Sequence, residues 1–267
     1  MSQQVPVYGL DGSKKDSVIL PIIFNIKPRK DIIRRSIISI QINKKQKQGR
    51  DLLAGKRNTA ITWGAGYGVS RTPKRKGSGY PTSRHGAFTP ETKGGRIAHP
   101  PKIQKKLIKK VNIKEKKLAI ISAISATGMI KIVKERGHKI EKIPTLPLVI
   151  DDKIQAIKKT KEIKSIFEKL GLYDDILKSK NSKKIRAGKG KRRSRKYKIR
   201  KSVLIIIKED FGIIRAARNL PGVDIININK LNCEHLAPGA RLGRLTLWTQ
   251  SAFNSLNKIG DEIGKIL

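Results

Sequence analysis

Short aliphatic runs without alternation mark the second half of the chain. The clearest are LPLVI at 146–150 and VLIII at 203–207. A strand with one face in water alternates apolar and polar residues, whereas an unbroken apolar run is typical of a strand buried on both faces of a parallel sheet. We therefore predict buried strands at both places. Shorter strand patterns lie at 5–8, 18–20, 223–228 and 245–248.

Apolar residues at helical spacing fill the intervals between these strands. They predict a helix over 28–42, and Asn112 with Glu115 forms an Asn-x-x-Glu capping pattern for a second helix that ends at Gly137. Helical stretches are also predicted at 152–170, at 213–218 and from residue 250 onward. The alternation of strands and helices predicts an α/β fold, with one domain built on a mostly parallel sheet flanked by helices.

Both periodicities vanish between residues 43 and 100. This stretch holds ten glycines, four prolines and thirteen Lys or Arg residues, with Asp51 and Glu91 as its only acids. Structureless segments of this length are rare inside compact domains. We therefore predict a long, irregular, basic arm inserted after the first helix, extending over residues 43–105.

The rest of the chain, 1–42 together with 106–267, is predicted to form the globular α/β domain. A second basic stretch interrupts this domain at 178–201, where fourteen residues are Lys or Arg and none is acidic. A charge run is usually a solvated face, and that interpretation suits the dispersed lysines of 153–169. It does not suit 178–201, which we predict to be a nucleic-acid-binding loop.

The net charge supports the same interpretation. The chain has 61 basic and 20 acidic residues, which gives a formal net charge of +41. Such a chain repels itself and requires a polyanionic partner. Nucleic acid fits, because each Lys or Arg contact with phosphate releases condensed counterions. An anionic membrane surface is the competing partner, but we find neither a basic amphipathic helix nor an apolar run near 20 residues.

Motifs for small ligands are weak in this sequence. Residues 49–57 resemble a phosphate-binding loop, but five residues separate the glycines instead of four, and Arg57 stands where Ser or Thr must reach Mg²⁺. The four histidines lack metal-ligand spacing, and Cys233 is the only cysteine. We expect no cofactor, no metal and no disulfide. The N-terminus lacks a signal-peptide pattern, so we expect a cytoplasmic protein.

Four acids allow an enzymatic alternative. Asp151 and Asp152 follow one predicted strand, and Glu209 and Asp210 follow another. The carboxyl ends of parallel strands are where α/β enzymes place their sites, so these carboxylates could serve a Mg²⁺-dependent RNA nuclease. The other interpretation is that they begin helices and bind free N–H groups there. We favour the second.

Residue types in the basic stretches point to RNA. Glycine lets the backbone approach phosphate closely, Arg binds phosphate with two donors, and aromatic rings stack on bases. We expect the arm to fold on RNA. The candidate RNA contacts are Arg50, Lys56, Arg57, Trp63, Arg71, Lys74, Arg75, Lys76, Arg84, Lys93, Arg96, Arg186, Lys189, Lys191, Arg192, Arg193, Arg195, Lys196, Tyr197, Arg200 and Lys201.

Several of these segments resemble a known family. They include GRDLLAGKRNTAITWGAGYGVSRTPKRKGSG at 49–79, KGGRIAHPPK at 93–102, IRAGKGKRRSRKYKIRKSVLII at 185–206, ARNLPGVDIININKLN at 217–232 and LAPGARLGRLTLWTQSA at 236–252. In this order they resemble large-subunit ribosomal protein four in its archaeal and eukaryotic branch. The long C-terminal extension of eukaryotic members has no counterpart here, so we expect an archaeal-type protein.

The resemblance implies a structural role without catalysis. The α/β domain would sit on the outer side of the large ribosomal subunit, bound to 23S-type rRNA and to neighbouring large-subunit proteins, and it would support subunit assembly. The arm would reach the peptide exit tunnel and meet the nascent peptide near its tip. The resemblance places Arg71, Arg75, Arg84 and His85 at that tip. We expect no membrane partner and no homo-oligomer.

Overall fold

A six-stranded sheet forms the centre of the α/β unit. The computed structural model describes residues 3–261, with side chains for residues 3–257. The strands lie in the order β2-β1-β5-β10-β8-β9. Only β1 and β2 pair antiparallel, and the remaining neighbours are parallel. Their bounds are β1 Gln4–Tyr8, β2 Lys14–Ile19, β5 Leu148–Ile150, β8 Leu204–Ile207, β9 Asp224–Asn227 and β10 Thr246–Thr249.

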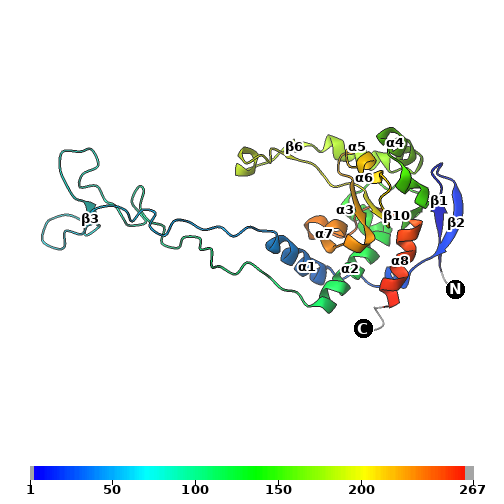
Figure 1. Cartoon of the computed structure of the whole chain (residues 1–267), viewed down its shortest axis with the longest axis horizontal. Helices are drawn as coiled ribbons and strands as arrows, with labels where there is room; N and C mark the ends of the chain where they lie inside the picture. The colour runs from blue at the N-terminus through cyan, green and yellow to red at the C-terminus, as the bar shows by residue number, and fades with distance from the viewer. Residues whose placement is uncertain (1–2, 262–267) are drawn as a thin grey trace. The chain divides into compact units, whose positions relative to one another are not determined.

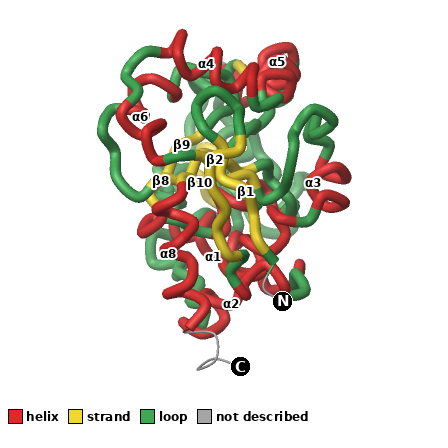
Figure 2. The backbone as a smooth tube through the Cα atoms, turned by 90° about the vertical axis from the view of Figure 1, so that its right-hand side faces the viewer, coloured by secondary structure: helices red, strands yellow, loops and turns green. Residues whose placement is uncertain are grey.

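Helices lie on both sides of this sheet (Figure 2). The α-helices are α1 Lys30–Asn43, α2 Ile113–Gly128, α3 Ile130–Arg136, α4 Thr160–Lys169, α5 Tyr173–Asn181, α6 Ile213–Ala217, α7 Cys233–Leu236 and α8 Gln250–Asp261. Single 3-10 turns are η1 Ile22–Asn25, η2 Asp152–Ala156, η3 Lys189–Arg192, η4 Ile228–Lys230 and η5 Pro238–Ala240.

The central strands divide the core into two layers. In β8, Leu204 and Ile206 face the cluster that includes residues of α1, α2, α7 and α8. Ile205 and Ile207 face the cluster built with residues of α3, α4, α5 and α6. Successive residues of a strand point to opposite faces, so these four side chains alternate between the two clusters. All four are fully buried, because both faces of the sheet are covered. The predicted α/β fold class with a mostly parallel sheet is confirmed.

The predicted helix at 112–137 is wrong in one respect, because it is two helices. Met129 is extended, with φ −88° and ψ 107°, and separates α2 from α3. Gly128 packs against the ring of Phe24, and a Cβ built there would lie 2.7 Å from a ring carbon. Asn112 stands at the expected N-cap, but its side chain makes no capping hydrogen bond. Glu115 instead accepts a 2.8 Å hydrogen bond from Arg35.

The predicted helix at 152–170 also differs from the structure. Residues Asp152–Ala156 form the 3-10 turn η2, Ile157 is extended, and α4 begins only at Thr160. In addition, α5 occupies the start of the basic stretch 178–201. This helix was not predicted, because its sequence is mostly polar and charged and its apolar face is too short to give a clear helical periodicity. Ile176 is buried on that face.

The chain divides into two compact units. One contains residues 1–41 and 110–267, with the sheet and its helices, and the other contains residues 42–109. The second unit is called the arm below. It contains one small sheet, in which β3 Ala60–Ile61 pairs antiparallel with β4 Lys74–Arg75 (Figure 1).

Candidate nucleic-acid interface

A basic hairpin extends from the α/β unit between α5 and β8 (Figure 1). We call residues 183–199 the basic hairpin. Its strands are β6 Lys184–Ile185 and β7 Tyr197–Lys198, which pair antiparallel, and η3 lies at its tip. Every residue of the hairpin except Gly190 is exposed. A backbone hydrogen bond of 2.8 Å from Arg186 N to Lys196 O extends the pairing.

Cationic side chains cover this hairpin. The ammonium of Lys183 lies 4.6 Å from the centre of the Tyr197 ring, and that of Lys196 lies 5.5 Å from it. Like charges at this density repel one another, and the hairpin contains no acid to offset them. The predicted contacts Arg186, Lys189, Lys191, Arg192, Arg193, Arg195, Lys196 and Tyr197 are all exposed on it. The hairpin therefore presents a surface suited to a polyanion.

Arg200 and Lys201 lie at the base of the hairpin and bind the protein itself. The Arg200 guanidinium donates to the carbonyl oxygens of Arg136 and Gly137, at 3.2 and 2.5 Å. The Lys201 ammonium lies 2.8 Å from a carboxylate oxygen of Asp224. These two residues thus differ from the predicted contacts on the hairpin, because their charged groups have acceptors outside the hairpin, whereas the Arg186 guanidinium donates within it, to Arg195 O at 3.2 Å.

The two ends of the arm run side by side. A Cβ built on Gly49 would lie 2.5 Å from the Ile103 side chain. Gly55 has a φ of +79°, and a Cβ there would lie 2.5 Å from the backbone nitrogen of Arg96. Only glycine allows both this backbone conformation and this close approach. The outgoing and returning segments are therefore in direct contact.

Beyond these contacts, the arm forms two loops around its small sheet (Figure 1). Arg75 N donates to His85 O at 3.1 Å, and Arg84 N donates to Arg75 O at 3.2 Å. This pairing brings residues 84–86 against β4 and separates a loop at 62–73 from a loop at 76–83. Arg71 lies in the first loop, and Arg84 and His85 follow the second. The side chains of these last three residues are exposed.

The predicted contacts of the arm fall into two groups. Trp63, Lys74, Arg75 and Arg96 are half-buried. The Lys74 ammonium lies 5.7 Å from the Trp63 ring centre, and the Arg96 guanidinium lies 5.8 Å from that of Phe88. The exposed group is Arg50, Lys56, Arg57, Arg71, Lys76, Arg84, His85 and Lys93. In this group Arg57 forms an ion pair with Asp51.

Three of the four acids considered for a nuclease are engaged with neighbouring groups. Asp151 and Asp210 each accept from the backbone N–H two residues further on, at 3.2 and 3.0 Å, where a helical turn begins. Asp152 accepts from Ser251 N at 3.0 Å and from its hydroxyl at 2.7 Å. Glu209 is exposed. Among residues 3–257, no group of three or more His, Cys, Asp or Glu side chains could hold a metal ion.

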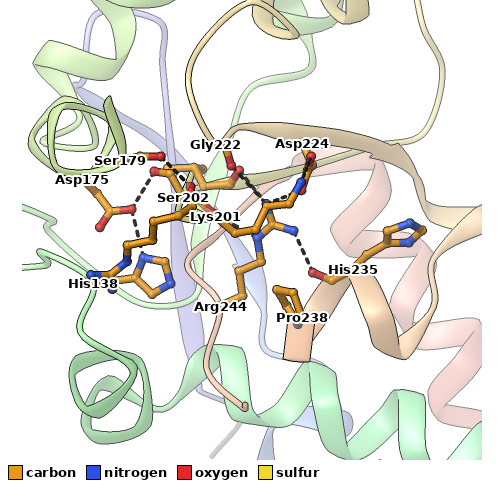
Figure 3. A network of polar contacts seen from close by, with 12 residues as sticks. His138, Asp175, Ser179, Lys201, Ser202, Gly222, Asp224, His235, Pro238 and Arg244 are labelled. Carbon is orange, nitrogen blue, oxygen red and sulfur yellow. Dashed lines mark hydrogen bonds and ion pairs between the residues drawn. The ribbon is translucent and has the colours of Figure 1, made fainter. Parts of the chain in front are cut away.

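A buried polar network lies beside the base of the hairpin (Figure 3). The Asp175 carboxylate, 1% exposed, accepts from His138 Nδ1 at 2.9 Å and from the Ser202 hydroxyl at 2.6 Å. The fully buried Arg244 donates to Ser202 O at 2.9 Å and to Asp224 Oδ2 at 2.6 Å. These residues were not predicted from the sequence, because bonds between positions 20 to 42 apart leave no local pattern.

Burial and hydrogen bonding set the charges in this network. Burial lowers the pKa of His138 despite the neighbouring carboxylate, so the ring is neutral at neutral pH. Burial alone would raise the pKa of Asp175, but hydrogen bonds from His138, from Ser202 and from Lys139 N lower it. The carboxylate therefore stays ionised and accepts from all three donors.

The sequence matches a protein-family model over most of its length. The model for the ribosomal protein L4/L1 family matches residues 18–259. The chain belongs to the ribosomal protein L4/L1 family. It is similar to the "Large ribosomal subunit protein uL4" of Methanopyrus kandleri, at 44% identity over 96% of this chain and 98% of that protein. The protein of the same name from Methanococcus aeolicus is 45% identical over 96% of this chain and 99% of that protein. The one from Methanosphaera stadtmanae is 44% identical over 97% of this chain and 96% of that protein.

Membership of the L4/L1 family decides between the two interpretations of the acids. Proteins of this family are structural constituents of the ribosome, so the chain is not an enzyme, and the nuclease alternative is wrong. The expected archaeal branch is confirmed by the relatives. As a ribosomal component, the protein is bound to ribosomes in the cytoplasm. No helix within the described part of the chain is long and apolar enough to span a membrane.

Proposed function

We propose that the chain binds 23S-type rRNA in the large ribosomal subunit through two separate basic surfaces, the basic hairpin and the arm. The observation that carries this proposal is the hairpin, because it presents exposed cations over seventeen consecutive positions without one acid. Contacts between these cations and phosphate release counterions and favour binding. The relatives carry the name of a large-subunit protein, which supports an RNA partner of this kind.

The arm serves a second role in this proposal. Its few backbone pairings and its exposed loops give it little internal stability, so RNA has to supply the surface on which it becomes ordered. The loops at 62–73 and 76–83 then line the peptide exit tunnel, where Arg71, Arg75, Arg84 and His85 meet the nascent peptide. Ordering of the arm by rRNA also contributes to subunit assembly.

The remaining partners follow from the same proposal. Neighbouring large-subunit proteins bind the exposed surface of the α/β unit that rRNA does not cover. One copy of the chain binds each subunit, since two copies at +41 each repel one another and do not form a homo-oligomer.

Amide hydrogen exchange tests the RNA-dependent ordering of the arm. In the free protein, amides at 50–100 should exchange without protection, whereas those at 112–135 and 203–228 should be protected by the helices and sheet of the α/β unit. Addition of 23S-type rRNA transcript should then protect the arm. Protection of 50–100 in the free protein, or no gain with rRNA, would contradict folding of the arm on RNA.

Photo-crosslinking tests the tunnel contact separately. A photoreactive amino acid in place of Arg84, in ribosomes stalled during translation, should form a covalent product with the nascent chain. The same group in place of Lys56 should react with rRNA instead, because Lys56 lies in the part of the arm where its two ends still run together. If positions 71, 84 and 85 all capture only rRNA, the proposed tip is wrong.

A further inference from the structure

Several hydrogen bonds hold the base of the basic hairpin. We infer that these bonds fix the direction of the hairpin before RNA arrives, and that Ser182 and Asp175 are positioning residues for RNA binding. We call the set Asp175, Ser179, Ser182, Arg200, Ser202 and Arg244 the hairpin clamp. This inference rests on the proposed function, because it assigns the clamp a role in RNA binding by the hairpin.

The last turn of α5 holds the returning strand of the hairpin. The Ser182 hydroxyl accepts from Arg200 N at 2.9 Å, and the Ser179 hydroxyl donates to Arg200 O at 2.6 Å. Both backbone polar groups of Arg200 are thus bound by serines of α5 and of its C-cap. The segments that flank the hairpin on its two sides are joined directly to one another.

The Arg200 side chain adds a third attachment. It donates to the carbonyl oxygens of Arg136, the last residue of α3, and of Gly137, the C-cap of that helix. The Lys178 ammonium donates to the same Gly137 oxygen at 3.0 Å. Carbonyls at the end of a helix lack partners within the helix, so these cations satisfy them. The base of the hairpin is therefore tied to α3 as well as to α5.

Ser202 connects the hairpin to the buried network (Figure 3). It is fully buried, and each of its polar groups has a partner. Its hydroxyl donates to Asp175, its N–H donates to Gly222 O at 2.8 Å, and its carbonyl accepts from Arg244. Because buried polar groups cost free energy when they lose their partners, this arrangement resists movement of the strand that leads into β8.

Gly222 shows how closely the backbone packs at this point. Its φ is +78°, and a Cβ there would lie 2.3 Å from the Ser179 hydroxyl and 2.5 Å from Arg200 O. The backbone at Gly222 thus packs closely against Ser179 and Arg200 at the base of the hairpin. A charged surface held in one direction loses less conformational entropy on binding than a mobile one, which favours a higher affinity.

The experiment combines substitutions in the hairpin clamp with substitutions at the hairpin tip. Ser182→Ala removes the acceptor for Arg200 N and the donor to Ser179 O, and it leaves every cationic side chain in place. It should weaken binding of 23S-type rRNA transcript about fivefold, which corresponds to the net free energy of about one hydrogen bond. Amides at 184–198 should exchange faster, while those of β8 stay protected. Asp175→Asn alters the clamp within the buried network and should also weaken rRNA binding.

A background variant separates positioning from general stability. In the background variant, Lys189, Lys191, Arg192 and Arg193 are all changed to Gln, so the hairpin contributes little to rRNA affinity. Adding Ser182→Ala to this variant should leave its rRNA affinity unchanged. An equal loss in both backgrounds would mean a merely structural role and would overturn the inference. Ser165→Ala is the matched control, because Ser165 lies in α4 and donates to a carbonyl of its own helix at 2.8 Å, as Ser182 donates to Ser179 O at 2.6 Å.

Two failures remain distinguishable. If Ser182→Ala and Asp175→Asn bind rRNA like the wild type while the four tip changes weaken binding, the clamp inference is overturned and the proposed function stands. If the four tip changes leave rRNA binding unaltered, the proposed role of the hairpin itself is wrong.

Discussion

Replacing Lys189, Lys191, Arg192 and Arg193 with Gln should weaken binding of 23S-type rRNA about a hundredfold near 0.1 M salt, because four phosphate contacts and their counterion release are lost. The slope of log K against log salt should fall by about 3 to 4 for the same reason. All four side chains are exposed at the hairpin tip, so the fold should be unaffected. Filter binding or fluorescence anisotropy over a salt series measures both quantities.

The control removes the same charge from another surface. Lys153, Lys158, Lys159 and Lys161 are exposed at η2 and the start of α4, where acids such as Glu162 are interspersed. Changing these four to Gln should lower the affinity for rRNA by no more than about threefold, since these side chains affect binding only through the general field of the protein. Equal losses in the two quadruple variants would show that net charge alone decides binding.

Trp248→Ala should lower the free energy of unfolding of the α/β unit by about 3–5 kcal/mol, the usual cost of removing a large aromatic side chain from a core. Trp248 is fully buried in β10, a central strand of the sheet. Its ring packs edge-on against Phe24 and Phe253, with ring centres 6.4 and 6.1 Å away. A loss of this size is a large part of the total stability of a typical domain. Guanidinium unfolding followed by far-ultraviolet circular dichroism measures it.

The other tryptophan of the chain provides the control. Trp63 lies half-buried in the arm, where it packs edge-on against Tyr67 and beside the Lys74 ammonium. Trp63→Ala should change the unfolding of the α/β unit by less than about 0.5 kcal/mol, since it removes no contact within that unit. A large loss in this variant would mean that the arm stabilises the α/β unit in the free protein.

Local patterns predicted much of the α/β unit. The runs at 146–150 and 203–207 contain the strands β5 Leu148–Ile150 and β8 Leu204–Ile207, which are buried on both faces as expected, because an unalternating aliphatic run needs apolar neighbours on each side. The break at Met129 escaped prediction for a tertiary reason. Apolar spacing continues across it, and the packing of Gly128 against the Phe24 ring at this point joins residues about a hundred positions apart.

The candidate interface was predictable in composition but not in geometry. The absence of acids from 178–201 marked the hairpin, because charge repulsion needs no tertiary structure to be recognised. The same criterion included Arg200, Lys201 and the end of α5, although these groups bind the protein itself. Composition reports how much charge a segment carries, and it does not report which charges find acceptors after folding.

By itself, then, the sequence determined the fold class, the two basic stretches and the family, since each of these depends on residue types and spacings within short segments. Only the tertiary structure decided the strand order β2-β1-β5-β10-β8-β9 and the clamp that joins Asp175, Ser202 and Arg244. The physical reason is the same in both cases. Hydrogen bonds between segments distant in the chain form only once the sheet has brought those segments together, and no local periodicity encodes which segments will meet.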